Sequence, residues 1–165
     1  MAQTLLRGNP VTTAGDLPAV GSSAPAFTLI DAQLKPVSLA EFAGKKVVIS
    51  IFPSIDTPTC ATSTRKFNEQ AAAKAGTTVL TVSEDLPFAL GRFCGAEGIE
   101  NVHTLSAFRS TFGKDYGVEM TSGPLLGLCA RAVVVVDETG KVIYNQMVDD
   151  ITNEPNYDAA LAVLG

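Results

Sequence analysis

Short runs of apolar and β-branched residues alternate with longer polar and alanine-rich stretches along the chain. The runs at 45–52, 77–83 and 132–136 are rich in valine, isoleucine and threonine, which is typical of buried strands. The stretch 61–75 lies between the first two runs, contains good helix formers and predicts a helix. Strand, helix and strand in this order predict an α/β fold with a right-handed crossover and a parallel strand pair. Further strands are expected at 26–30, 101–105 and 141–147, further helices at 86–95 and 157–164, and a helical or irregular segment at 108–116.

Two short features extend this core. Segments 4–7 and 11–13 flank Gly8-Asn9-Pro10 and are expected to pair as an N-terminal β-hairpin. The turn 137–140 is expected to close a second hairpin between the last two strands. Because no internal repeat, linker or low-complexity tract interrupts the pattern, residues 1–165 are expected to form a single domain.

Several residues are placed where helices should begin or end. Ser38, followed three residues later by Glu41, forms the pattern of a capping box. The side chains of Thr57 and Asp85 are expected to cap the two helices that follow them. Gly76 is expected to end the helix at 61–75.

Cys60 lies where the strand at 45–52 ends and a helix begins. In open α/β sheets, functional sites are built at such carboxyl ends of strands. Thr57 as cap and Pro58 at the first helical position place Cys60 in the first turn of that helix. Unpaired N–H groups and the helix dipole favour a thiolate there, so the position predicts a nucleophile. The alternative is a small buried hydrophobe, the usual role of a free cysteine.

Composition and charge narrow the function classes. The chain has 165 residues, of which 46% are hydrophobic and 18% charged, and a net charge of -5. No basic patch is visible, which argues against nucleic acid and anionic membranes as partners, and no apolar run is long enough to span a membrane. The N-terminus does not have the pattern of a signal peptide, and three cysteines suggest a reducing compartment, so we expect a cytoplasmic protein. One histidine and no C-x-x-C pattern argue against a zinc site, and no cofactor is expected.

Pro53, Thr57 and Cys60 stand in the order P-x-x-x-T-x-x-C, which resembles the peroxidatic motif of peroxiredoxins. Further segments extend the resemblance over nearly the whole chain to the thiol peroxidase branch, an atypical two-cysteine subfamily. These segments are 8–10, 85–89, 92–98, 123–125, 130–132 and 154–164. The resemblance implies a thioredoxin-like fold of the peroxiredoxin type.

The resemblance also implies a role for each matching residue. Cys60 is the peroxidatic cysteine, which attacks a hydroperoxide and becomes a sulfenic acid. Thr57 hydrogen-bonds the thiolate and the peroxide, Pro53 shapes the pocket and shields the sulfenic acid from solvent, and Arg131 lies beside the thiolate. Cys94 is the resolving cysteine, and it forms an intramolecular Cys60–Cys94 disulfide that thioredoxin reduces. A homodimer with an antioxidant role, acting on hydrogen peroxide or organic hydroperoxides, is implied as well.

Each of these roles has a simpler alternative. Without the resemblance, Arg131, which precedes a valine run, would be interpreted as an ordinary charge at the end of a strand. In the same way, Cys94 would be interpreted as a structural thiol, and Thr57 would be interpreted as a helix cap without a catalytic role. A redox sensor with a thioredoxin-like fold and a one-cysteine peroxidase that uses an external thiol remain alternative functions. Since Cys60 and Cys94 are expected on different helices, both helices are expected to loosen when the disulfide forms.

Two cysteine positions differ from the family pattern. Many thiol peroxidases carry a further cysteine on the second crossover strand, where this chain has Thr81. Cys129 lies two residues before Arg131, so a regular strand would turn both toward one face, near the active site. We expect Cys129 to be a bystander.

The remaining candidates concern the core and the substrate. His103 is expected to be structural or at the surface. Five phenylalanines are expected in the core, namely Phe27, Phe42, Phe52, Phe67 and Phe93. A site for a bulky substrate is suggested by four apolar residues, namely Phe52, Met120, Leu125 and Leu126.

Overall fold

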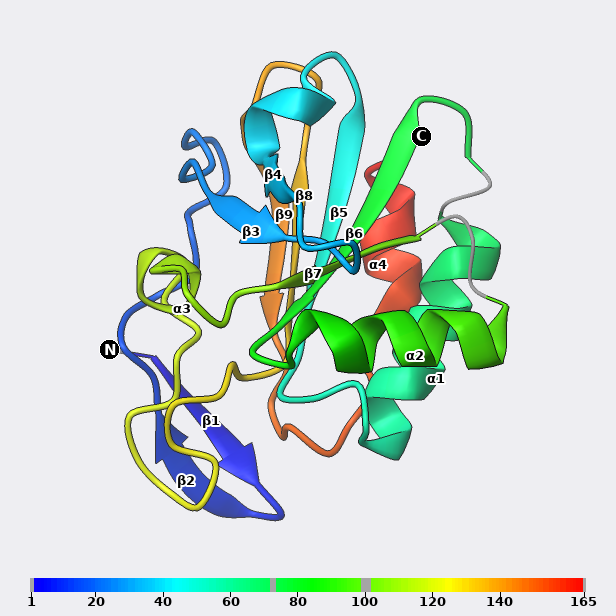
Figure 1. Cartoon of the computed structure of the whole chain (residues 1–165). Helices are drawn as coiled ribbons and strands as arrows, with labels where there is room; N and C mark the ends of the chain where they lie inside the picture. Colours follow the sequence, from blue (N-terminus) through cyan, green and yellow to red (C-terminus); the bar gives the residue numbers. More distant parts are fainter. Residues whose placement is uncertain (1, 72–73, 99–101, 165) are drawn as a thin grey trace.

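The computed structural model describes residues 2–71, 74–98 and 102–164, and its centre is a seven-stranded sheet in the order β4-β3-β7-β6-β5-β8-β9 (Figure 1). The strands of this sheet are β3 (Thr28–Ile30), β4 (Pro36–Ser38), β5 (Lys46–Ile51), β6 (Thr77–Ser83), β7 (Val102–Ser106), β8 (Ala132–Val136) and β9 (Val142–Met147). The helices are η1 (Leu39–Phe42), α1 (Pro58–Gln70), α2 (Pro87–Glu97), α3 (Phe112–Asp115) and α4 (Tyr157–Ala162). The predicted α/β fold is confirmed.

Strands β5 and β6 run parallel at the centre of the sheet, and β8 runs antiparallel on the other side of β5. Successive side chains of β5 point to opposite faces, so Val47 and Ile49 join one apolar core and Val48 joins another. Helices α1, α2 and α4 cover the face of Val48, and α3 lies on the opposite side (Figure 1). Burial on both faces explains why these strands are almost wholly apolar.

The predicted N-terminal hairpin is also confirmed. Strands β1 (Gln3–Leu6) and β2 (Asn9–Thr12) pair antiparallel outside the main sheet. Backbone hydrogen bonds from Leu5 to Asp149 and from Ile151 to Leu5 fasten the hairpin to the segment after β9. The hairpin therefore stands below the end of the sheet, next to the loop that precedes β8 (Figure 1).

The ends of the helices differ from their prediction. Helix α1 ends at Gln70 rather than at residue 75, and the backbone N–H of its C-cap residue, Ala71, donates to the Phe67 carbonyl. Helix α4 ends at Ala162 rather than at residue 164. Residues 72, 73 and 101, which were expected at the end of the first helix and the start of a strand, lie outside the described residues.

The three predicted N-caps have different outcomes. Thr57 is the N-cap residue of α1, as predicted, but its hydroxyl donates to the Ser54 carbonyl at 2.9 Å instead of accepting from the helix. Leu86, not Asp85, is the N-cap residue of α2. The capping box of η1 is present, with Glu41 accepting the Ser38 backbone N–H at 2.7 Å.

The five phenylalanines pack as predicted, three of them buried and Phe42 and Phe93 partly buried against the core. His103 lies at the surface against the Phe42 ring, with 5.4 Å between the ring centroids. No helix in the described part of the chain is long and apolar enough to cross a membrane.

Candidate active site

Cys60 is the third residue of α1, in the first turn that the sequence predicted. Its side chain is 0% exposed and packs with Phe52, Ile55 and Leu90 in a small apolar cluster. Phe52 and Ile55 belong to the loop between β5 and α1, whereas Leu90 comes from α2. The Cys60 side chain is therefore buried by residues of α2 and of the loop before α1.

Asp85 holds the loop that carries Cys60. One carboxylate oxygen accepts a hydrogen bond from Ser54 Oγ at 2.7 Å. The other accepts from the Ile55 backbone N–H at 2.7 Å and from Ser83 Oγ at 2.6 Å. Hydrogen bonds to a carboxylate are among the stronger ones in proteins, so Asp85 fixes the loop to the end of β6. Sequence reasoning missed this role, because the partners at residues 54 and 55 are about thirty positions away.

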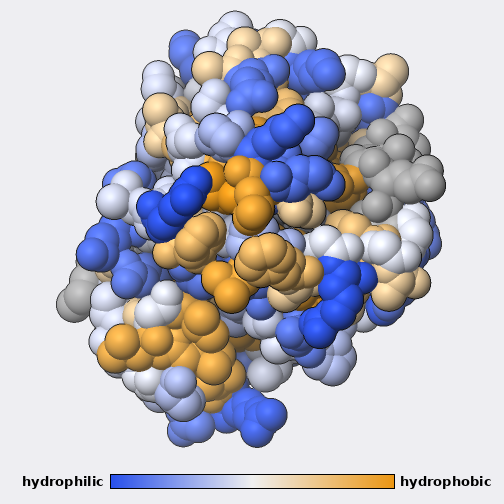
Figure 2. Space-filling view, viewed as in Figure 1, coloured by the Kyte–Doolittle hydropathy of each residue, from blue (hydrophilic) through white to orange (hydrophobic). Residues whose placement is uncertain are grey.

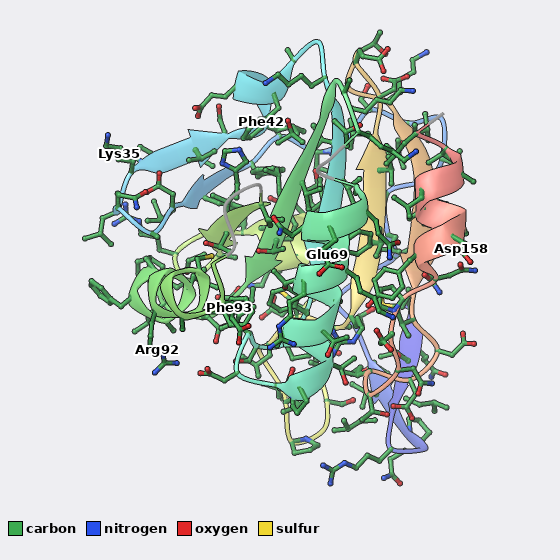
Figure 3. All side chains as sticks on the ribbon, turned by 90° about the vertical axis from the view of Figure 1, so that its right-hand side faces the viewer. Lys35, Phe42, Glu69, Arg92, Phe93 and Asp158 are labelled. Atoms are coloured by element: carbon green, nitrogen blue, oxygen red, sulfur yellow. The ribbon has the colours of Figure 1, made fainter. Side chains whose placement is uncertain are left out.

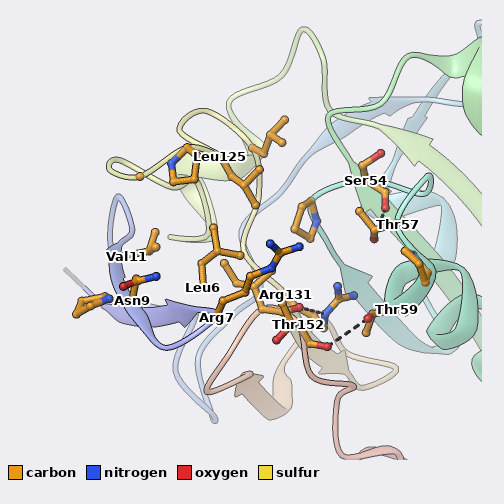
Figure 4. Close-up of a pocket in the computed structure, with 17 residues that line it drawn as sticks. Leu6, Arg7, Asn9, Val11, Ser54, Thr57, Thr59, Leu125, Arg131 and Thr152 are labelled. Atoms are coloured by element: carbon orange, nitrogen blue, oxygen red, sulfur yellow. Dashed lines mark hydrogen bonds between the residues drawn. The ribbon is translucent and has the colours of Figure 1, made fainter.

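A pocket of about 760 Å³ opens beside the start of α1 (Figure 4). It brings together three of the predicted site residues, Pro53, Thr57 and Arg131. Cys60 is not among the lining residues, but its neighbours 57–59 are. The remaining lining residues are Leu6, Arg7, Asn9, Pro10, Val11, Ser54, Gly123, Pro124, Leu125, Leu128, Ile151 and Thr152.

Arg131 is a buried cation in this pocket, with only 3% of its surface exposed. Its Nε donates to the Ile151 carbonyl at 2.8 Å, which fixes the plane of the guanidinium. Its Nη1 is buried and has no hydrogen-bond partner in the described structure. A buried charged donor without a partner is costly, so this geometry is suited to binding an oxygen atom of a ligand.

Cys94 lies on α2 and is half-buried. Its thiol donates to Thr104 Oγ1 at 3.6 Å, and burial raises its pKa. The neighbouring Phe93 packs against the Cys60 cluster and, like Cys94, against the core on the Val48 face of the sheet, and it lies between α2 and α1 in Figure 3. All three cysteines are free thiols, so the structure represents a form without the Cys60–Cys94 disulfide.

Two ion pairs connect α2 to α1 and its loop. Arg65 on α1 binds Glu97 through two hydrogen bonds of 3.0 and 2.9 Å. Arg92 on α2, on the outer side of the helix in Figure 3, reaches Asp56 at 2.9 Å. Each exposed pair of this kind contributes little stability, so these pairs orient α2 but break at a low free-energy cost when it moves.

Cys129 does not share the surroundings of Arg131. Strand β8 begins only at Ala132, so the regular alternation expected before it is absent. Cys129 is buried in the apolar core with Phe112 and Tyr116 and does not line the pocket. Burial raises its pKa, and the nearby carboxylates of Glu84 and Glu119 add to this effect. Each of these influences opposes formation of a thiolate at this position.

The apolar residues suggested for a bulky substrate are divided between the pocket and other surroundings. Leu125 lines the pocket. Phe52 and Met120 are buried in apolar clusters, and Leu126 is 66% exposed away from the pocket lining. The pocket lining therefore includes one of the four suggested residues, because short-range sequence cannot tell which side of a loop faces a cavity.

Glu84 is predicted to make stability fall as pH rises. Burial, and then the charge of Glu119, raise its pKa to about 7. Between pH 4.5 and 7 the folded chain therefore holds a proton that the unfolded chain has released, so the free energy of unfolding declines across this window. Glu84→Gln, which mimics the protonated form, should be more stable than wild type by about 1 kcal/mol at pH 8, after allowance for partial exposure.

Urea unfolding of both proteins at pH 4 and pH 8 measures this effect. At pH 4, below the ordinary pKa of 4.5, the two curves are expected to come together, because the wild-type carboxyl is then largely protonated in the folded and in the unfolded chain. An equal stability difference at both pH values would show that Glu84 acts through packing instead of charge.

Comparison with known proteins places this site in a family. The Redoxin family profile matches residues 19–161. Thiol peroxidase from Corynebacterium glutamicum is 59% identical over 164 residues, which cover 99% of each chain. Thiol peroxidase from Mycobacterium tuberculosis is 60% identical over 165 residues, covering 100% of this chain and 99% of that protein. A peroxiredoxin-like protein from Aquifex aeolicus superimposes with a TM-score of 0.94 at 42% identity, covering 99% of this chain and 96% of that one.

The fold, with a cysteine in the first turn of α1 beside a pocket, therefore defines a protein of the peroxiredoxin class. The chain belongs to the Redoxin family, and the predicted resemblance to thiol peroxidases is confirmed by relatives that match it over nearly their whole length.

Proposed function

We propose that this protein is a thiol peroxidase that uses Cys60 as its nucleophile. The thiolate sulfur attacks the distal oxygen of a hydroperoxide, and the O–O bond breaks. Cys60 becomes a sulfenic acid, and the departing oxygen takes up a proton and leaves as water or an alcohol. The observation that carries this proposal is the partnerless Nη1 of Arg131, buried in the pocket beside the first turn of α1.

Arg131, Thr57 and Pro53 support this step in different ways. The free N–H of Arg131 can donate to the oxygen on which negative charge develops. The Thr57 hydroxyl gives its proton to Ser54, so its oxygen is available to accept the peroxide O–H. Pro53 supplies an apolar wall without an N–H group, which limits access of water to the sulfenic acid.

In the second step the Cys94 sulfur attacks the Cys60 sulfenic acid, releases water and forms the intramolecular disulfide. Leu90 and Phe93 pack against the Cys60 cluster, so α2 has to move before the two sulfur atoms meet. The two exposed ion pairs between α1 and α2 break in the same motion. A dithiol of the thioredoxin type, in the cytoplasm, then supplies two electrons and returns both thiols.

The proposal includes a homodimer. Three large apolar side chains are exposed close to the start of α2, namely Leu86, Phe88 and Phe108. Figure 2 shows apolar surface gathered in this part of the molecule. Phe88 is 68% exposed, and an exposed cluster of this kind is suited to contact a second copy of the chain.

Peptide mass mapping under non-reducing conditions, after one equivalent of cumene hydroperoxide, tests the mechanism. A Cys60–Cys94 linked peptide supports two-cysteine chemistry, and Cys94→Ser should then accumulate the sulfenic acid at Cys60. A free Cys94 beside oxidised Cys60 in the wild type would instead indicate a one-cysteine enzyme. An unchanged Cys60 would overturn the peroxidase proposal, and oxidation without repeated turnover would indicate a redox sensor.

A further inference from the structure

The pocket beside Cys60 has two arginines and no acidic residue among its lining residues. Arg131 lies at the end near α1, and Arg7 reaches in from the turn of the N-terminal hairpin (Figure 4). This positive lining stands out in a chain whose net charge is -5. Like charges in one cavity favour a negatively charged ligand.

Arg7 occupies an unusual backbone position. Arg7 and Gly8 form the two-residue loop between β1 and β2, with φ angles of 51° and 83°. Two positive φ angles in such a loop favour asparagine, aspartate or glycine at its first position. Arginine there is strained, so the turn itself does not explain the choice of side chain.

Asp150 stabilises this strained turn. Its carboxylate accepts from the backbone N–H groups of Arg7 at 3.2 Å and Gly8 at 2.9 Å. It also accepts from the Thr152 hydroxyl at 2.7 Å, which contributes most to lowering its pKa to about 2. Because Asp150 binds these groups, it does not pair with the guanidinium of Arg7, which has no ion-pair partner among the described residues.

Part of the pocket wall is apolar. Figure 4 shows the Arg7 side chain extending from the hairpin into the pocket, on the side of Leu6 and Arg131. Leu125, Leu128 and other apolar side chains line the same cavity. A ligand that fits has a polar oxygen at Arg131, an apolar body and an anionic group at Arg7.

We propose that Arg7 determines specificity by binding the anionic group of an amphiphilic hydroperoxide, such as the peroxide of a long-chain carboxylic acid. The proposal rests on the peroxidase function proposed above. The hydroperoxide end lies at Arg131 and Cys60, the chain lies along the apolar wall, and the carboxylate meets the guanidinium of Arg7. Arg7 therefore separates charged substrates from neutral ones of the same length.

The test compares linoleic acid hydroperoxide with its methyl ester, both below their micelle concentrations. In Arg7→Asn, which suits the positive φ, the ratio of kcat/KM for the acid to that for the ester is expected to fall about fivefold, through KM. Arg7→Lys should retain most of the wild-type ratio. Lys35→Asn, which removes an equal charge at an exposed position away from the pocket, should leave the ratio unchanged. Higher salt should lower the ratio in wild type and Arg7→Lys.

An unchanged acid-to-ester ratio in Arg7→Asn, or an equal loss on both substrates, would overturn the role of Arg7. Turnover of neither hydroperoxide by the wild type would instead overturn the peroxidase proposal, so the two failures are distinct. A guanidinium also binds phosphate, so a hydroperoxide of lysophosphatidic acid serves as a third substrate in the comparison. A larger Arg7 effect on that substrate would support charge recognition and identify phosphate as the anion.

Discussion

Replacing Arg131 with methionine is expected to lower kcat/KM for hydroperoxides by about 10²–10³-fold, because a fixed donor to the departing oxygen is lost. The fold should tolerate the change. Methionine fills a similar volume, and the buried cation that it replaces has a partnerless Nη1. The free energy of unfolding is therefore expected to change by less than about 1 kcal/mol, since the lost bond to Ile151 is offset by removal of the buried charge.

Stopped-flow oxidation of Cys60 and urea unfolding, measured on the same preparation, separate the two effects. Arg131→Lys is the matched control, because it keeps the positive charge but not the planar guanidinium with its several N–H donors. It should recover part of the oxidation rate. A loss of activity that runs parallel to a loss of stability would assign Arg131 a structural role and remove the observation on which the peroxidase mechanism rests.

The second large effect is expected at Asp85, which we consider a positioning residue. Asp85→Ala leaves Ser54, Ser83 and the Ile55 amide without their acceptor, which should cost about 3 kcal/mol of stability. The loop before Cys60 then loosens, so oxidation of Cys60 by peroxide should slow by about tenfold. Formation of the disulfide from the sulfenic acid should not slow, because it requires this loop to open.

Asp85→Asn provides the control for this prediction. Its amide oxygen can accept from Ile55 and its amide nitrogen can donate to Ser54 Oγ, so it should recover most of the oxidation rate. Rapid-quench measurement of the two steps distinguishes the alternatives. If both steps slowed equally in Asp85→Ala, Asp85 would serve general stability and not the position of the loop.

Some elements of the fold follow from the local sequence pattern alone, and others do not. Four consecutive valines predicted strand β8 with its observed bounds, because a run this apolar is stable only inside a sheet. The alanine-rich helix α1 was predicted too long, since helix propensity carries no information about where the chain must turn to reach β6. That residues 1–165 form one domain stays a prediction.

At the site, too, local sequence signals predicted some residues and missed others. Cys60 at a strand–helix junction was evident from short-range signals, and the resemblance to peroxiredoxins led to Pro53, Thr57 and Arg131, which do share one pocket. Asp85 was mistaken for a helix cap, because its real partners lie in another loop. Arg7 was interpreted only as part of a hairpin, since its direction into the pocket depends on how that hairpin docks.

Phe93, which packs against the clusters of both cysteines, has a consequence for oxidative damage. A sulfenic acid at Cys60 either meets Cys94 or meets a second hydroperoxide, which converts it irreversibly to sulfinic acid. The same side chain that shields Cys60 also delays Cys94, so its packing sets the kinetic partition between recycling and permanent inactivation. In the proposed mechanism, protection of the nucleophile and susceptibility to over-oxidation therefore have one structural cause.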